Sequence, residues 1–297
     1  SHLDSIRNSD DLRDAQNAML PEVTQFFSRI PLNKGLWKRI KAYSESDGAK
    51  ALEGIQARFL DETVKDFLRS GADLPADKKA RLEEVQSELA KVTQKFSENV
   101  LDSTNAWDLV LEDDSRLGGL PDTAKAVLRA EAAAKDLGSD DAPVYRITLK
   151  APVFIPVLEY AEDESLRREV WEGSITIGRD GDFDNTELIR QILTLRQERA
   201  EILGKKDFAD QVLEERMAKN GATALGFVED LAAKTRPFFE KEIEALKAFR
   251  AEQEADFAGE FQPWDVAYWS EKLRKAQYDF DEEKVRPYFA IDNVIEG

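Results

Sequence analysis

The sequence predicts a mostly α-helical protein, a multi-helix array that also contains a small β-sheet. Three observations support this fold class. Apolar residues recur at steps of three, four and seven along most of the chain, which is the pattern of helices with one buried face. The period changes to two near 106–112, and a second strand candidate lies at 144–150. The 297 residues are 42% apolar, with five Trp and sixteen Phe, which is enough to fill a core.

Residues 1–70 are predicted to form three or four helices, because short apolar periods alternate there with acidic and basic faces. The predicted breaks lie near Pro31, Asp47-Gly48 and Gly71. A longer helix follows, with Asp77 as its cap, and continues to Val100. One face of this helix carries an apolar seam formed by Leu82, Val85, Leu89, Val92 and Phe96. Such a seam could form a coiled coil, but one this short is more typical of a helix packed inside a bundle.

The predicted strand at 106–112 places Trp107, Leu109 and Leu111 on one face, because alternate side chains of a strand point the same way. The second strand, at 144–150, follows a helix that Asp122 is expected to cap and Gly138 to stop. With a helix between them the two strands could pair in either direction, so the direction of the sheet stays open.

The segment Ala151 to Val157 is expected to be extended, because the rings of Pro152 and Pro156 disfavour helix in the residue before each. Helix returns at Glu164–Trp171, and a turn-rich loop follows at 178–182.

A helical hairpin is predicted from Asp184 to Asn220. Asp184 and Glu187 have the spacing of a capping box, and Gly204 lies where a left-handed helix stop favours glycine. Asp207 is then expected to cap a second helix from Phe208 through Met217.

The C-terminal part is predicted to be helical as well. A long charged helix spans 223–254, and Pro237 is expected to kink or split it. Pro263-Trp264-Asp265 opens a last helix. The changes of pattern divide the chain into a helical N-terminal region at 1–105, a mixed strand and helix segment at 106–160, and a helical region at 161–297.

Composition excludes several functions. A net charge of −18 argues against a nucleic-acid partner, which requires clustered cations. No run of about eighteen apolar residues exists, so no membrane span is expected. The absence of Cys excludes disulfides and thiolate chemistry and favours a cytoplasmic location. His2 is the only histidine, so the chain offers no ligand set for a catalytic zinc and no base to activate a Ser or Thr nucleophile.

Three further groups of residues could suggest a site, and each has a simpler interpretation. Gly118-Gly119 lacks the context of a phosphate loop and is interpreted as a turn. The aromatic cluster Trp264, Tyr268 and Trp269 could be a ligand platform, but core packing is favoured. The acidic pairs are interpreted as solvated helix faces; they are Glu83-Glu84, Glu214-Glu215 and Glu282-Glu283. No catalytic or metal residue is assigned, and substrate-binding residues stay unknown.

Several segments resemble the thimet oligopeptidase family of zinc metallopeptidases, and specifically its oligopeptidase A branch. The longest is Leu-Thr-Leu-Arg-Gln-Glu-Arg-Ala-Glu-Ile-Leu-Gly at 193–204. The others lie at 96–102, at 208–209 with 216–218, at 262–272 and at Arg286-Pro287-Tyr288-Phe289. Each motif alone is weak, but together and in order they are specific, and the similarity extends along essentially the whole chain.

This resemblance implies a two-lobed helical body with a narrow channel that admits short unfolded peptides. Family members bind one zinc through a His-Glu-x-x-His helix and a Glu on a following helix. No position here matches that motif, so we expect an interior or N-terminal portion that lacks the catalytic half and, alone, is not an enzyme. Its expected partners are the missing catalytic half and, for the parent enzyme, short peptides. The alternative is a freestanding helical scaffold or binding protein that kept the fold and lost the chemistry.

A portion cut from a two-lobed protein should expose apolar surface that the rest would cover. The residues expected near that surface are Trp107, Tyr145, Trp264 and Trp269.

Overall fold

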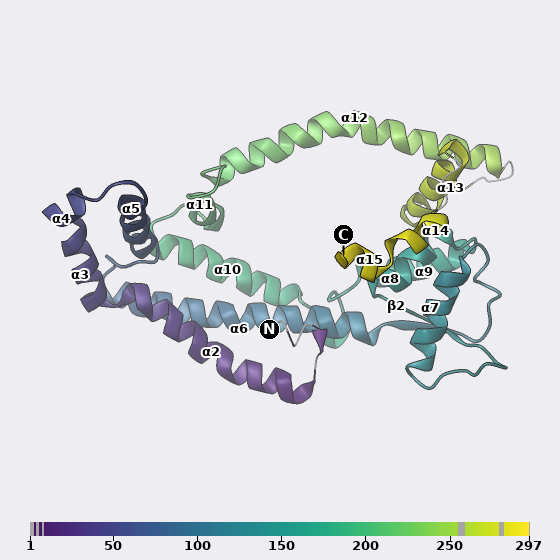
Figure 1. Ribbon diagram of the computed structural model, residues 1–297, viewed down its shortest axis with the longest axis horizontal. Helices are drawn as coiled ribbons and strands as arrows, with labels where there is room; N and C mark the ends of the chain where they lie inside the picture. The colour runs from purple at the N-terminus through teal and green to yellow at the C-terminus, as the bar shows by residue number, and fades with distance from the viewer. Residues whose placement is uncertain (1–2, 4–5, 8, 255–258, 279–281, 297) are drawn as a thin grey trace. The chain divides into compact units, whose positions relative to one another are not determined.

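The computed structural model describes residues 1–297 except 1–2, 4–5, 8, 255–258, 279–281 and 297. The described chain is mostly helical and has one two-stranded sheet, so the predicted fold class is confirmed (Figure 1). Contacts divide it into two compact units. Unit 1 consists of Ser1–Asn99 and Asp184–Glu229, and unit 2 of Val100–Phe183 and Asp230–Gly297. The division at 1–105, 106–160 and 161–297 describes the sequence pattern and stays a prediction.

Unit 1 is built from helices only, as far as the structure describes it. The helices α6 and α12 begin in unit 1 and end in unit 2. The bounds are α2 Asp10–Leu32, α3 Lys34–Ser44, α4 Asp47–Lys50, α5 Gly54–Arg69, α6 Ala76–Ala106, α10 Thr186–Ile202, α11 Phe208–Leu213 and α12 Gly221–Gln253.

The first helices of unit 1 break close to the predicted places, but for different local reasons. Pro31 lies inside α2, and the break comes at Asn33, whose side chain accepts the Leu36 N–H at 2.9 Å and so caps α3. Asp47 lies inside the one-turn helix α4, with breaks on both sides of it. Gly71 ends α5 as predicted, with φ +91°. Asp77 is not the cap of α6, because the helix already begins at Ala76, directly after a proline.

The predicted hairpin of α10 and α11 is confirmed, although its details differ. Gly204 has φ +73° after α10, and Asp207 accepts the Asp210 N–H at 2.9 Å and caps α11. The predicted capping box at Asp184 is wrong. The N-cap residue of α10 is Asn185, and its side chain makes no capping hydrogen bond. The second helix is shorter than predicted, since α11 ends at Leu213.

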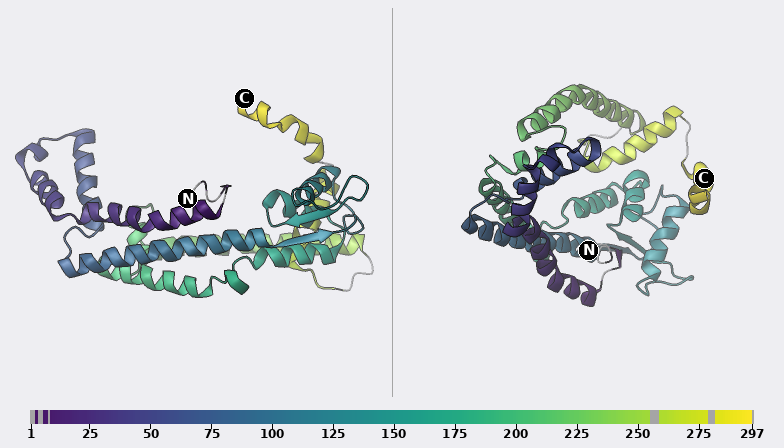
Figure 2. Two further views of the ribbon diagram at one scale, coloured as in Figure 1. Left: turned by 90° about the horizontal axis from the view of Figure 1, so that it is seen from below. Right: turned by 60° about the vertical axis from the view of Figure 1, so that its left-hand side comes forward.

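The helices α6 and α10 lie side by side in unit 1 (Figures 1 and 2). Asn185 is buried between them, with Nδ2 donating to the Phe96 carbonyl at 3.2 Å and Oδ1 accepting from Asn99 Nδ2 at 3.0 Å. This use of its side chain explains why Asn185 does not cap α10. Arg81 of α6 and Glu198 of α10 form a bidentate salt bridge, with Arg81 Nε donating to Glu198 Oε1 at 2.6 Å and Arg81 Nη2 donating to Glu198 Oε2 at 2.9 Å.

The core of unit 2 is formed by a sheet and the helices around it. Strands β1 Asp108–Leu111 and β2 Tyr145–Thr148 pair antiparallel, with Leu111 opposite Tyr145, which confirms the small sheet and settles its direction. The helices are α7 Asp122–Ala133, α8 Ala151–Tyr160 and α9 Glu164–Ile175. The buried cluster contains Leu111, Leu117, Leu120, Ala124, Leu128, Tyr145, Ile147, Val153, Val157, Ala161, Leu166 and Val170.

The expectation of an extended segment at 151–157 is wrong, because α8 occupies Ala151–Tyr160. Pro152 lies in the first turn, where the missing N–H has no helical partner to lose. Pro156 lies inside the helix, but burial of Val153 and Val157 in the core cluster outweighs the lost hydrogen bond.

The cap and stop expected for the helix before β2 are also wrong. The N-cap residue of α7 is Pro121, which makes no side-chain capping hydrogen bond, and Asp122 is the first residue of the helix. The helix ends at Ala133, and Asp136 at φ +56° turns the chain before it reaches Gly138.

The turn at Gly118-Gly119 is confirmed. Gly119 has φ +83°, and a Cβ there would lie 2.2 Å from the carbonyl oxygen of Tyr160.

The rest of unit 2 is helical. The long helix α12 continues through Pro237 without a split. The 3₁₀ turn η1, Gly181–Phe183, overlaps the end of the loop predicted at 178–182, and η2 at Pro263–Asp265 leads into α13, Val266–Tyr278. This helix is not the last, because α14 Glu282–Val285, η3 Arg286–Phe289 and α15 Ile291–Glu296 follow. Within the described residues, no helix is both long and apolar enough to cross a membrane.

Candidate functional site

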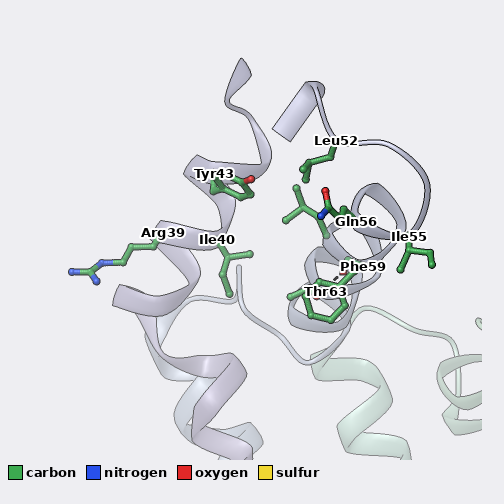
Figure 3. A pocket seen from close by; sticks show the side chains of 9 residues that line it. Arg39, Ile40, Tyr43, Leu52, Ile55, Gln56, Phe59 and Thr63 are labelled. Carbon is green, nitrogen blue, oxygen red and sulfur yellow. Dashed lines mark hydrogen bonds between the residues drawn. The ribbon is translucent and has the colours of Figure 1, made fainter. Parts of the chain in front are cut away.

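An apolar groove in unit 1 is the candidate binding site. It lies between α3 and α5, has a volume of about 710 Å³, and is called the α3–α5 groove below (Figure 3). Its lining is formed by Arg39, Ile40, Tyr43, Leu52, Ile55, Gln56, Phe59, Leu60 and Thr63.

Trp37 on α3 contacts α5, the other helix of the groove. This buried side chain stacks on Phe67 of α5, with ring centroids 5.8 Å apart. Trp37 Nε1 donates to Asp73 Oδ1 at 2.5 Å, and Lys41 Nζ pairs with Asp73 Oδ2 at 3.2 Å. The hydrogen bond from Trp37, supported by Lys41, lowers the pKa of Asp73. These contacts join α3 to α5 and to Asp73.

The upper part of the groove is uncovered. Ile55 is 88% exposed and Phe59 is 74% exposed, although both belong to the apolar side of α5. The sequence pattern predicted helices with apolar faces in residues 1–70 but did not indicate this groove. Periodicity shows which face of a helix is apolar and does not show whether another element covers that face.

A second candidate is a buried ionic cluster in unit 2, called the Asp265 cluster. The Asp265 carboxylate is fully buried and accepts from Arg167 Nη2 at 2.9 Å, Arg250 Nη1 at 2.5 Å and the Gln262 N–H at 2.9 Å. Arg250 also pairs with Glu164 at 3.0 Å. Both carboxylate oxygens are thus occupied by contacts that join α9, α12 and η2, so the cluster is structural and offers no free base.

Two of the three aromatic residues next to the Asp265 cluster, Tyr268 and Trp269, are core residues, as predicted. Tyr268 and Trp269 are buried, and the ring of Tyr268 lies 4.1 Å from the Arg167 guanidinium carbon. Trp264 is partly buried and its Nε1 donates to Glu164 at 3.3 Å.

The prediction of where apolar surface is exposed is wrong. Tyr145 and Trp269 are buried, and Trp107 packs so closely on Gly173 that a Cβ there would lie 2.5 Å from the ring. Each of these aromatics finds its partner within unit 2. The large exposed apolar side chains lie elsewhere, among them Phe26, Phe27, Ile55, Phe59, Phe227, Phe238, Phe239, Tyr288, Phe289 and Ile291.

Two of the acidic pairs make ion pairs. Glu83-Glu84 lie on α6, but Glu214-Glu215 lie in the turn after α11, so their interpretation as a helix face is wrong. Glu83 pairs with Arg29 at 3.2 Å, and Glu214 with Lys205 at 2.7 Å. His2 and the side chains of Glu282 and Glu283 lie outside the described residues. Among the described residues, no group of three or more His, Cys, Asp or Glu could hold a metal ion.

Comparison with known sequences shows the class of protein. Residues 1–79 match the family model for the Neurolysin/Thimet oligopeptidase N-terminal domain, and residues 157–297 match Peptidase family M3. The chain therefore belongs to the thimet oligopeptidase family, within peptidase family M3.

Inside that family the similarity to oligopeptidase A is high. Oligopeptidase A of Escherichia coli is 35% identical over 303 residues, which cover 100% of this chain and 43% of that protein. Probable cytosolic oligopeptidase A of Arabidopsis thaliana is 33% identical, over 100% of this chain and 42% of that protein. Dipeptidyl carboxypeptidase of E. coli is 25% identical, over 98% and 42%. These findings confirm the resemblance drawn from the sequence, and the chain spans less than half the length of these relatives.

Proposed function

We propose that this chain is the non-catalytic portion of a zinc-dependent oligopeptidase that hydrolyses short unfolded peptides. The observation that carries the proposal is the similarity to oligopeptidase A along 100% of the chain, at 35% identity. The relatives are oligopeptidases and dipeptidyl carboxypeptidases by name, so peptide hydrolysis is the shared activity from which the proposal is drawn.

The residues described here do not fit a catalytic zinc. Such a site needs three nitrogen or oxygen ligands with an open position for water. The chain has no Cys and a single His, and its described carboxylates form no group of three that could hold a metal ion. The proposal therefore places the zinc and its ligands in the part of the enzyme that this chain does not span. No step of the reaction is assigned to the residues seen here.

This chain would contribute two helical units to the enzyme. The bidentate Arg81–Glu198 pair and the Asp265 cluster each fix helices that are distant in sequence. Its proposed partners are the catalytic half and, for the whole enzyme, short peptides. A cytoplasmic location is proposed as well, supported by the absence of Cys and by the cytosolic oligopeptidase A of A. thaliana.

The test compares this chain with the full genomic reading frame that encodes it. Both proteins are incubated with a quenched fluorescent peptide and with a folded domain, with zinc or with a chelator. The chain alone should stay at background, and the full-length protein should cleave the peptide, spare the folded domain and lose activity with chelator. Chelator-sensitive cleavage by the chain alone would contradict the proposal. A reading frame without a zinc motif would favour the freestanding scaffold.

A further inference from the structure

We draw no further inference here: the strongest candidate, the apolar surface patch of α12 that exposes Leu231, Phe238 and Phe239, carries no proposal, because nothing in the described part of the structure shows what covers it in a chain that spans less than half the length of its relatives.

Discussion

The Asp265 cluster of unit 2 and the α3–α5 groove of unit 1 use similar residues in opposite ways. In the cluster, Arg167 and Arg250 are buried, and each donates to one oxygen of a fully buried carboxylate. In the groove, Arg39 is exposed beside apolar side chains that nothing in the described chain covers. The difference shows that side-chain type alone does not reveal a binding site. What distinguishes the groove is polar and apolar groups whose contacts are not completed within their own unit.

The strongest way to test this comparison is to remove the central carboxylate of the buried cluster. Asp265→Ala should destabilise unit 2 by about 3–5 kcal/mol, because it leaves two buried guanidinium groups without their carboxylate. Hydrogen exchange of the amides in α9 and α13 would measure the loss. The control is Asp47→Ala in unit 1, which breaks an exposed pair with Lys50 and should leave protection unchanged. Equal effects of the two substitutions would show that the buried Asp265 cluster stabilises its unit no more than an exposed ion pair does.

Substituting one glycine in each unit by alanine compares how closely the two sites are packed. Gly119→Ala should cost about 3 kcal/mol or more, because the residue has φ +83° and a Cβ would meet the Tyr160 carbonyl at 2.2 Å. Gly54→Ala in unit 1, at φ +55° with nothing within 4 Å, should cost only about 1 kcal/mol. Thermal unfolding of both variants gives the comparison. A cost for Gly54→Ala as large as that for Gly119→Ala would show that backbone conformation, not packing, decides both.

The helix cap Asp163 gives a pH-dependent test. Burial opposes ionisation of this carboxyl, but hydrogen bonds from Ser165, Arg116 and the Leu166 N–H outweigh it and lower the pKa to about 2. Because the folded pKa lies below the ordinary value, the stabilisation is fully present above pH of about 4 and is lost as pH falls toward 2. Asp163→Ala should therefore cost about 2 kcal/mol at pH 7 and progressively less at lower pH. A cost that does not change between pH 7 and pH 2.5 would contradict this assignment.

The smallest expected effect on stability is at the groove itself. Phe59→Gln removes a ring that is 74% exposed, so the free energy of unfolding should change by less than about 0.5 kcal/mol. The same variant should bind less of a fluorescent apolar dye than the parent chain, since the dye reports uncovered apolar surface. Trp269→Ala, at a buried ring in unit 2, should instead cost about 3–5 kcal/mol. A large loss of stability in Phe59→Gln would show that Phe59 is a core residue.

The helices and strands were largely predictable from the sequence, because periodicity reports local structure. Leu109 and Leu111 alternate with exposed neighbours as expected, and Gly204 ends its helix. Errors came where tertiary contacts override local preference. Pro156 lies in a helix because its neighbours fill the core, and Asn185 gives its side chain to α6 instead of capping α10.

The candidate site was less predictable than the fold. The contact between Arg167 and Asp265 joins residues 98 positions apart, and no local pattern indicates such a pairing. The α3–α5 groove depends on which helix faces remain uncovered, and a single sequence does not contain that information directly.

Polar contacts of two kinds, ionic and neutral, join α6 to α10, and they respond differently to pH and salt. The Arg81–Glu198 pair is ionic, and the hydrogen bond from Arg81 lowers the pKa of Glu198. That contribution is lost as pH falls through the lowered pKa, and added salt screens it. The buried amides of Asn99 and Asn185 carry no charge and exchange no proton in this range. In acid or in concentrated salt the Arg81–Glu198 contribution to the alignment of α6 against α10 therefore weakens, while the hydrogen bonds of Asn185 to Asn99 and to the Phe96 carbonyl remain.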